Sequence, residues 1–188
     1  MRLLRRLSRA DLLTLGSVAL SIAAFRLLLQ GERARSIGVM ALAIVGDHLD
    51  GIVARRFGAS PYGKLLDSFF DALNYLTFPA LYLMIETDLA LVYLPVVFAM
   101  VAAGLLRLAR FTQEGFADEQ AHHYAGMPVF YLGFAPLLLF LGVPAPVVSV
   151  AVVAAAWLMI GEVPFAKPRG VLIPAAVFAL AIWLLVWA

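Results

Sequence analysis

The chain has 188 residues, of which 64% are hydrophobic and 14% are charged. Soluble domains are nearer half apolar and a quarter charged, so this composition excludes an ordinary soluble protein and predicts an all-α, polytopic membrane bundle. A net charge of +2 is too small to indicate nucleic-acid binding, and a chain with no cysteine has neither disulfides nor thiolate metal sites. A span needs about 20 apolar residues, so residues 1–188 can form six or seven helices in a single membrane domain.

Seven apolar segments are separated by short breaks that are rich in glycine and proline. The expected helices are Leu12–Leu29, Ser36–Arg56, Pro61–Ile85, Leu89–Phe111, Val129–Leu141, Pro146–Ile160 and Val171–Trp187. The fifth and sixth are short, which leaves the count at six or seven. The break from Phe57 to Pro61 contains a glycine suited to ending one helix and a serine and proline suited to starting the next. The second and third helices are therefore expected to be antiparallel neighbours.

The basic residues gather on one side of the expected bundle. With the N-terminus in the cytoplasm, two of them, Arg33 and Arg35, fall on the far side. Eleven fall on the cytoplasmic side: Arg2, Arg5, Arg6, Arg9, Arg55, Arg56, Lys64, Arg107, Arg110, Lys167 and Arg169. The positive-inside rule then predicts a multi-pass protein of the cell membrane, with the turn between the second and third helices facing the cytoplasm.

Four aspartates lie inside the second and third expected spans. Asp47 and Asp50 are three residues apart on one face of the second helix, and Asp67 and Asp71 are four residues apart on one face of the third. A charge in mid-membrane costs on the order of 3 kcal/mol, and four converging carboxylates would also repel one another. A pair of hard divalent cations, Mg²⁺ or Mn²⁺, compensates such a cluster and also suits substrate phosphates.

Small residues accompany these carboxylates. Gly51 and Ala54 lie beside the aspartates of the second helix, and Gly63 lies one turn before Asp67. Small side chains leave room for a ligand and let it approach the backbone closely. They also serve close helix packing in membranes, and the glycines alone do not distinguish the two roles.

The spacing of these residues resembles the signature of a known family. Asp47-x-x-Asp50-Gly51-x-x-Ala54-Arg55, seven further residues, and Gly63-x-x-x-Asp67-x-x-x-Asp71 are similar to the motif of the CDP-alcohol phosphatidyltransferases. Three later segments resemble the phosphatidylserine synthase branch of that family, namely Arg107-Leu108-Ala109-Arg110-Phe111, Tyr124-Ala125-Gly126-Met127-Pro128 and Pro164-Phe165-Ala166-Lys167.

The resemblance implies a reaction and assigns roles to the motif. A phosphatidyl group would pass from a CDP-lipid of the CDP-diacylglycerol type to a small alcohol, with release of CMP, in a protein that is a homodimer. Asp71 would act as the base that deprotonates the acceptor. Two divalent cations would be held by Asp47, Asp50, Asp67 and Asp71, and the CDP-lipid would be bound by Gly51, Ala54, Arg55 and Gly63.

The acceptor is less well defined by the sequence. L-Serine is the acceptor that the branch implies, but Asn74 begins a stretch that departs from the pattern of that branch, and it lies near Asp71, where an acceptor could bind. Arg107, Arg110 and Lys167 are candidates to hold an acceptor carboxylate or a lipid phosphate. Glycerol 3-phosphate or an inositol phosphate remains an alternative acceptor.

A transporter with an ion or proton pathway is the alternative from a different class. Intramembrane carboxylates are typical of such proteins. All four aspartates cluster toward one side, however, and the sequence has no pair of broken helices in corresponding halves. The pattern therefore favours the enzyme.

Overall fold

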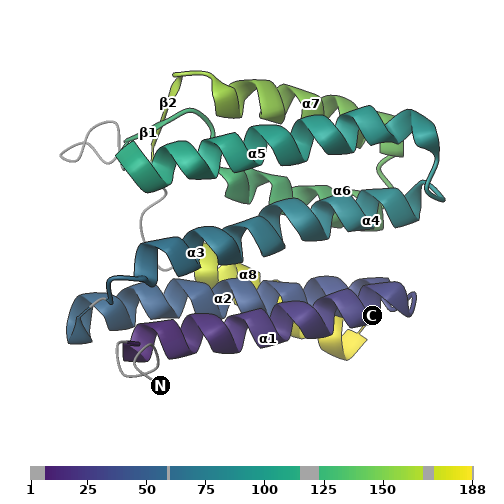
Figure 1. The fold of residues 1–188 in the computed structure, drawn as a ribbon. Coiled ribbons are helices and arrows are strands. Elements are labelled where there is room, and N and C mark those ends of the chain that lie inside the picture. Colours follow the sequence, from purple (N-terminus) through teal and green to yellow (C-terminus); the bar gives the residue numbers. More distant parts are fainter. Residues whose placement is uncertain (1–6, 59, 115–122, 167–171, 188) are drawn as a thin grey trace. The chain divides into compact units, whose positions relative to one another are not determined.

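The computed structural model describes residues 7–58, 60–114, 123–166 and 172–187, and nearly all of them are helical (Figure 1). The all-α membrane fold is therefore confirmed. The helices form two compact units, a division that the composition did not predict. The first unit holds α1, α2, α3 and α8, and the second begins at Asp71 and holds α4 to α7 with both strands.

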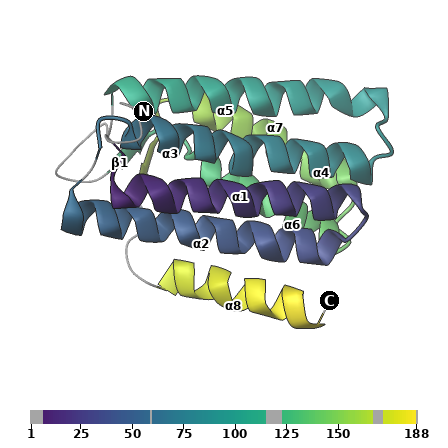
Figure 2. The ribbon, with the colours of Figure 1, turned by 60° about the horizontal axis from the view of Figure 1, so that its bottom comes forward.

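The first unit is built on the antiparallel pair α1 (Arg9–Leu29) and α2 (Arg33–Phe57), which pack together along their lengths (Figure 2). Helix α1 begins with a capping box, in which the Ser8 side chain accepts from the backbone N–H of Asp11 and the Asp11 carboxylate accepts from the backbone N–H of Ser8. The two helices approach closely at Gly46, where an added methyl group would collide with the Ser17 hydroxyl. Small residues at such crossings let membrane helices pack backbone to backbone.

Helix α8 (Leu172–Trp187) returns from the far end of the chain and lies along α2 (Figures 1 and 2). Gly38 of α2 provides the contact, because a Cβ atom there would lie 3.0 Å from Leu185 Cγ and 3.2 Å from the Ala181 carbonyl oxygen. The C-terminal apolar segment therefore completes the first unit, although more than a hundred residues separate it from α2 in the sequence.

The third expected span begins at Gly63 rather than at Pro61 and is not a uniform α-helix. It consists of α3 (Gly63–Asp71), a π-helical segment (Ala72–Thr77) and α4 (Phe78–Glu86), with no break between them. Within the π-helical segment the Thr77 hydroxyl donates to the Ala72 carbonyl five residues earlier, at 3.0 Å. Short π-helical segments occur often at functional sites, and their hydrogen bonds span one residue more than those of an α-helix. Side chains after Asp71 therefore project in directions that differ from those that regular α-helical spacing predicts.

The second unit packs α4 against α5 and α6, and α5 against α7. After α4 the chain forms a 3₁₀ turn (Leu91–Tyr93) and α5 (Leu94–Glu114), and later a 3₁₀ segment (Val129–Gly133), α6 (Phe134–Phe140) and α7 (Ala145–Ile160). The core of this unit is apolar and includes Tyr82, Leu83, Met100 and Met159, which are all fully buried.

Two segments that were expected to be irregular pair as short strands. Strand β1 (His123–Ala125) is antiparallel to β2 (Pro164–Ala166), with Tyr124 opposite Phe165. The guanidinium of Arg110 joins this sheet to α7, because Nη2 donates to the carbonyls of Ala125, Met159 and Gly161 at 2.6, 3.0 and 3.1 Å. Nη1 donates to the Ile160 carbonyl at 3.3 Å. These bonds satisfy carbonyls that the end of α7 leaves without intrahelical donors.

Three of the described helical stretches are long and apolar enough to cross a membrane by themselves: Arg9–Leu29, Arg33–Phe57 and Leu91–Glu114. Shorter apolar helices cover Val129–Phe140, Ala145–Ile160 and Ala175–Val186. At 1.5 Å per residue, each of these is shorter than the roughly 30 Å hydrocarbon core. The chain is membrane-integral, and the full count of six or seven spans stays a prediction.

The loop that Arg110 holds is predicted to depend on Gly126. This glycine has φ +80°, and a Cβ atom would lie 2.6 Å from Arg110 Nη2 and from the carbonyl oxygens of Met159 and Gly161. Gly142 has a similar φ of +83° but nothing within 4 Å of a Cβ position, so it is a matched control. Gly142→Ala should cost about 1 kcal/mol for the backbone conformation. Gly126→Ala should cost a further 1–3 kcal/mol or so for overpacking, measured by thermal unfolding in detergent. Equal melting temperatures for the two variants would contradict the packing described here.

Candidate active site

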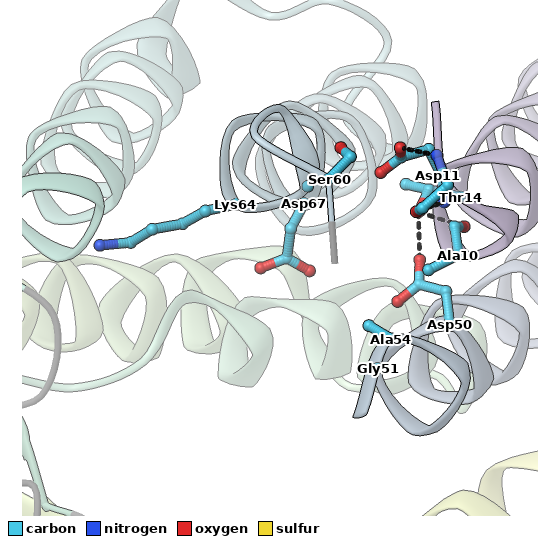
Figure 3. Close-up of a pocket in the computed structure, with 11 residues that line it drawn as sticks. Ala10, Asp11, Thr14, Asp50, Gly51, Ala54, Ser60, Lys64 and Asp67 are labelled. Carbon is cyan, nitrogen blue, oxygen red and sulfur yellow. Dashed lines mark hydrogen bonds between the residues drawn. The ribbon is translucent and has the colours of Figure 1, made fainter. Parts of the chain in front are cut away.

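The first unit contains a cavity of about 220 Å³ between α1, α2 and the start of α3 (Figure 3). Its lining draws on all three helices and on the turn before α3. The residues that line it are Ser8, Ala10, Asp11, Thr14, Asp50, Gly51, Ala54, Ser60, Gly63, Lys64 and Asp67. Both halves of the aspartate motif therefore contribute to one cavity.

Asp50 is the most deeply buried of the predicted metal ligands and is only 8% exposed. Its carboxylate accepts a short hydrogen bond from the hydroxyl of Thr14 on α1 (Figure 3). The Ala10 carbonyl, 3.2 Å from the same hydroxyl, is the alternative acceptor within α1. The Thr14 hydroxyl replaces part of the hydration that the Asp50 carboxylate loses on burial, so α1 helps to accommodate this polar group.

Asp11 is a second buried carboxylate in the cavity and is only 1% exposed. One of its oxygens accepts from the Ser8 backbone N–H at 2.6 Å in the capping box. A Cβ atom at Gly63 would lie 3.6 Å from Asp11 Oδ1, so the start of α3 passes close to this carboxylate. A negative charge in the first turn of α1 is also favoured by the helix dipole.

The small residues of the motif lie on the cavity wall. Gly51 and Ala54 of α2 face it, and a Cβ atom at Gly51 would lie 3.6 Å from Arg55 Nη1. The Arg55 guanidinium therefore lies over Gly51 at the cytoplasmic end that the sequence predicts for α2. Gly51 and Ala54 leave free volume along the wall, whereas Arg55 lies next to Gly51 but is not itself one of the residues that line the cavity.

Helix α3 contributes its N-terminal turns to the cavity. In Figure 3, Asp67 extends from α3 toward the level of Asp50 and Ala54 on α2, while the side chain of Lys64 runs in the other direction. In the preceding turn the Ser60 hydroxyl accepts from the backbone N–H of Tyr62 at 3.0 Å. This bond orders the turn that brings α3 to the cavity.

The remaining predicted site residues do not line this cavity. Asp47 lies one turn before Asp50 on α2 and is half-buried, whereas Asp71 is the last residue of α3 and belongs to the second unit, as does Asn74. Lys167 lies outside the described residues. In the described part of the chain, no three Asp, Glu or His side chains lie close enough to share one ion.

The two candidate arginines of α5 have different surroundings, although they are one turn apart. The guanidinium of Arg110 is engaged by the four carbonyls of Ala125, Met159, Ile160 and Gly161, which gives it a structural role that the sequence did not predict. Arg107 is 5% exposed, and its guanidinium carbon lies 5.6 Å from the centres of the Phe111 and Tyr124 rings.

Sequence reasoning missed the contribution of α1, which supplies Ser8, Asp11 and Thr14 to the cavity. The signal was nevertheless present in the sequence. Asp11, Thr14, Ser17 and Ser21 recur every three or four residues in an otherwise apolar helix, and all four are buried on one face. Such a polar stripe in a membrane helix indicates a face turned toward protein or a polar ligand rather than toward lipid.

Comparison with known proteins agrees with the motif. Residues 7–187 match the sequence profile of the CDP-alcohol phosphatidyltransferases, and the chain belongs to this family. A CDP-diacylglycerol–serine O-phosphatidyltransferase of Mycobacterium leprae is 30% identical over an alignment 208 residues long, which takes in 93% of this chain and 68% of that protein. An enzyme of the same name from Methanocaldococcus jannaschii is 42% identical over 79 residues, which cover 40% of this chain and 38% of that protein. The predicted family and enzyme class are confirmed in preference to the transporter.

The hydrogen bond between Thr14 and Asp50 yields a prediction. Thr14→Val keeps the shape of the side chain but leaves the buried carboxylate without this donor, which should destabilise the fold by about 1–3 kcal/mol. Thr14→Ser retains the hydroxyl and should stay close to the parent in a thermal melt in detergent. If Thr14→Val and Thr14→Ser melt together, the bond contributes nothing to stability.

Proposed function

We propose that this protein transfers a phosphatidyl group from CDP-diacylglycerol or a similar CDP-lipid to L-serine, releasing CMP. The observation that carries the proposal is the cavity, which gathers Asp50, Gly51 and Ala54 from one half of the motif and Gly63 and Asp67 from the other. Family membership supports the donor and the reaction class. The names of both relatives support serine as the acceptor.

The donor nucleotide and its diphosphate are assigned to the cavity of the first unit. Gly51, Ala54 and Gly63 leave space along its wall, and Arg55 provides a guanidinium for a phosphate oxygen. Thr14 and Asp11 add a hydroxyl and a carboxylate that can hydrogen-bond a polar ligand within the membrane.

The donor set of the cavity fits divalent cations. Carboxylate oxygen is the ligand that Mg²⁺ and Mn²⁺ prefer, and Mg²⁺ is commonly held by one or two carboxylates together with waters and substrate phosphates. A cage of three protein carboxylates is therefore not required. In the proposal, Asp47, Asp50, Asp67 and Asp71 would hold two such cations, which when bound neutralise the diphosphate and stabilise the departing CMP.

The proposed reaction is an in-line displacement at the lipid-linked phosphorus. The Asp71 carboxylate takes the proton from the acceptor hydroxyl, and the acceptor oxygen forms a bond to that phosphorus. The bond from phosphorus to the CMP oxygen breaks, and CMP leaves with the electron pair. The helix supports this role for Asp71, because Asp71 follows Asp67 by one turn at the end of α3.

The proposed setting follows from the charge pattern. Basic residues outnumber acidic ones at the ends of α2 and α5 that carry Arg55, Arg56 and Arg107, and by the positive-inside rule this supports an active site on the cytoplasmic side of the cell membrane. A homodimer is part of the proposal through family resemblance. Glycerol 3-phosphate and inositol phosphate are the competing acceptors.

Two conservative substitutions test the roles of the aspartates. Asp71→Asn should abolish transfer because the amide cannot accept the proton, while metal-dependent binding of the CDP-lipid should be reduced less than in Asp47→Asn. CMP release from CDP-diacylglycerol in the presence of Mg²⁺ or Mn²⁺ measures transfer, and calorimetry with the CDP-lipid and each metal measures binding. Wild-type turnover in both variants would refute the assignment, and screening serine, glycerol 3-phosphate and inositol phosphate identifies the acceptor.

A further inference from the structure

Among the described residues, the second unit contains a buried arginine whose Nε atom has no hydrogen-bonding partner. Arg107 lies on α5 and is 5% exposed, and its Nε atom is buried without an acceptor among the described residues. Burying a guanidinium in this way is costly, because nothing replaces the water molecules that its N–H groups have lost. A buried arginine of this kind indicates that an anion completes the site.

Two aromatic rings hold the guanidinium in position. Its central carbon lies 5.6 Å from the centre of the Phe111 ring and 5.6 Å from the centre of the Tyr124 ring. The rings are themselves in contact, with centres 5.7 Å apart and planes inclined by 59°. Cation–π contacts stabilise the charge but accept no conventional hydrogen bonds, so the N–H groups of the fork still require an oxygen ligand.

The charges that face Arg107 do not neutralise it by contact. Asp71 and Glu114 attract the guanidinium, and Arg110 repels it. The Arg107 Nε atom has no hydrogen-bonding partner among the described residues, so none of these charges is bonded to it there. Asp71 belongs to the same unit as Arg107 and its charge acts on the guanidinium, so the proposed base and a ligand on the arginine belong to one unit.

Arg110 is not available to share such a ligand, because four backbone carbonyls engage its guanidinium. A phosphate monoester carries close to two negative charges and usually requires several cations. A carboxylate carries one charge in a plane, which one guanidinium matches in a bidentate pair. The site around Arg107 therefore fits a carboxylate better than a phosphate.

We propose that Arg107 binds the carboxylate of the acceptor, so that the second unit selects a small hydroxy amino acid over a phosphorylated alcohol. The inference rests on the proposed function, whose acceptor it defines. The acceptor carboxylate pairs with the guanidinium between Phe111 and Tyr124, and the hydroxyl of the same molecule is directed to Asp71. Arg107 is then the group that determines acceptor specificity.

The test compares L-serine with ethanolamine, which is serine without its carboxylate. Arg107→Gln should raise the KM for serine by about 10- to 150-fold, the range expected for losing a charged hydrogen-bonded pair. The loss should be specific to serine, so the ratio of kcat/KM for serine to kcat/KM for ethanolamine should fall by the same factor. Arg107→Lys should recover part of the loss, because it keeps the charge without the planar fork. Arg26→Gln, which removes an exposed arginine of α1, serves as the control.

Three results would overturn the inference. They are an equal loss of activity toward serine and ethanolamine in Arg107→Gln, a serine KM in that variant equal to the parent value, and a preference of the parent for glycerol 3-phosphate. Calorimetric titration of L-serine separates the two proposals. If the parent binds serine, Arg107→Gln does not, and the parent releases no CMP with any acceptor, the inference is supported and the proposed function is refuted.

Discussion

The structure of the first unit depends on supplying hydrogen-bond donors to carboxylates that are buried among membrane helices. Asp50 is buried in α2, and the Thr14 hydroxyl of α1 donates to it, while Asp11 of α1 is held by the capping box with Ser8. Each bond replaces part of the hydration that burial removes. The close approach of α1 and α2 at Gly46 brings these groups within reach of one another. The contacts that pack α1 against α2 therefore also position the polar groups of the cavity.

The π-helical segment Ala72–Thr77 is the feature that most changes the interpretation of the motif. It begins directly after Asp71, so the regular spacing of Gly63, Asp67 and Asp71 ends where the second unit begins. Asn74 was placed near Asp71 by α-helical spacing, but in the structure it lies inside the π-helical segment and is 1% exposed. π-Helical turns are rare and occur frequently at functional sites, so the presence of one beside the proposed base is consistent with a functional constraint.

Arg107 and Arg110 show how the same residue type can serve two purposes on one helix. Arg110 reaches the end of α7 and strand β1, where unpaired carbonyls accept its N–H groups. Arg107 is directed toward aromatic rings, which leave its donors for a ligand. The Arg110 contacts join segments that are distant in the sequence, whereas Phe111 lies on the same helix as Arg107. No spacing rule distinguishes the two arginines, because the role of each depends on which groups contact its guanidinium in the folded unit, backbone carbonyls in one case and aromatic rings in the other.

The sequence by itself determined the membrane class, the approximate positions of the helices and the residues of the aspartate motif. These features depend on local hydropathy and on helical periodicity, which are properties of short stretches of chain. Only the tertiary structure decided that α1 lines the cavity through Thr14 and Asp11, that β1 pairs with β2, and that Arg110 is structural. These features depend on contacts between segments far apart in the chain, which are selected by burial and hydrogen bonding in the whole fold rather than by neighbours in the sequence.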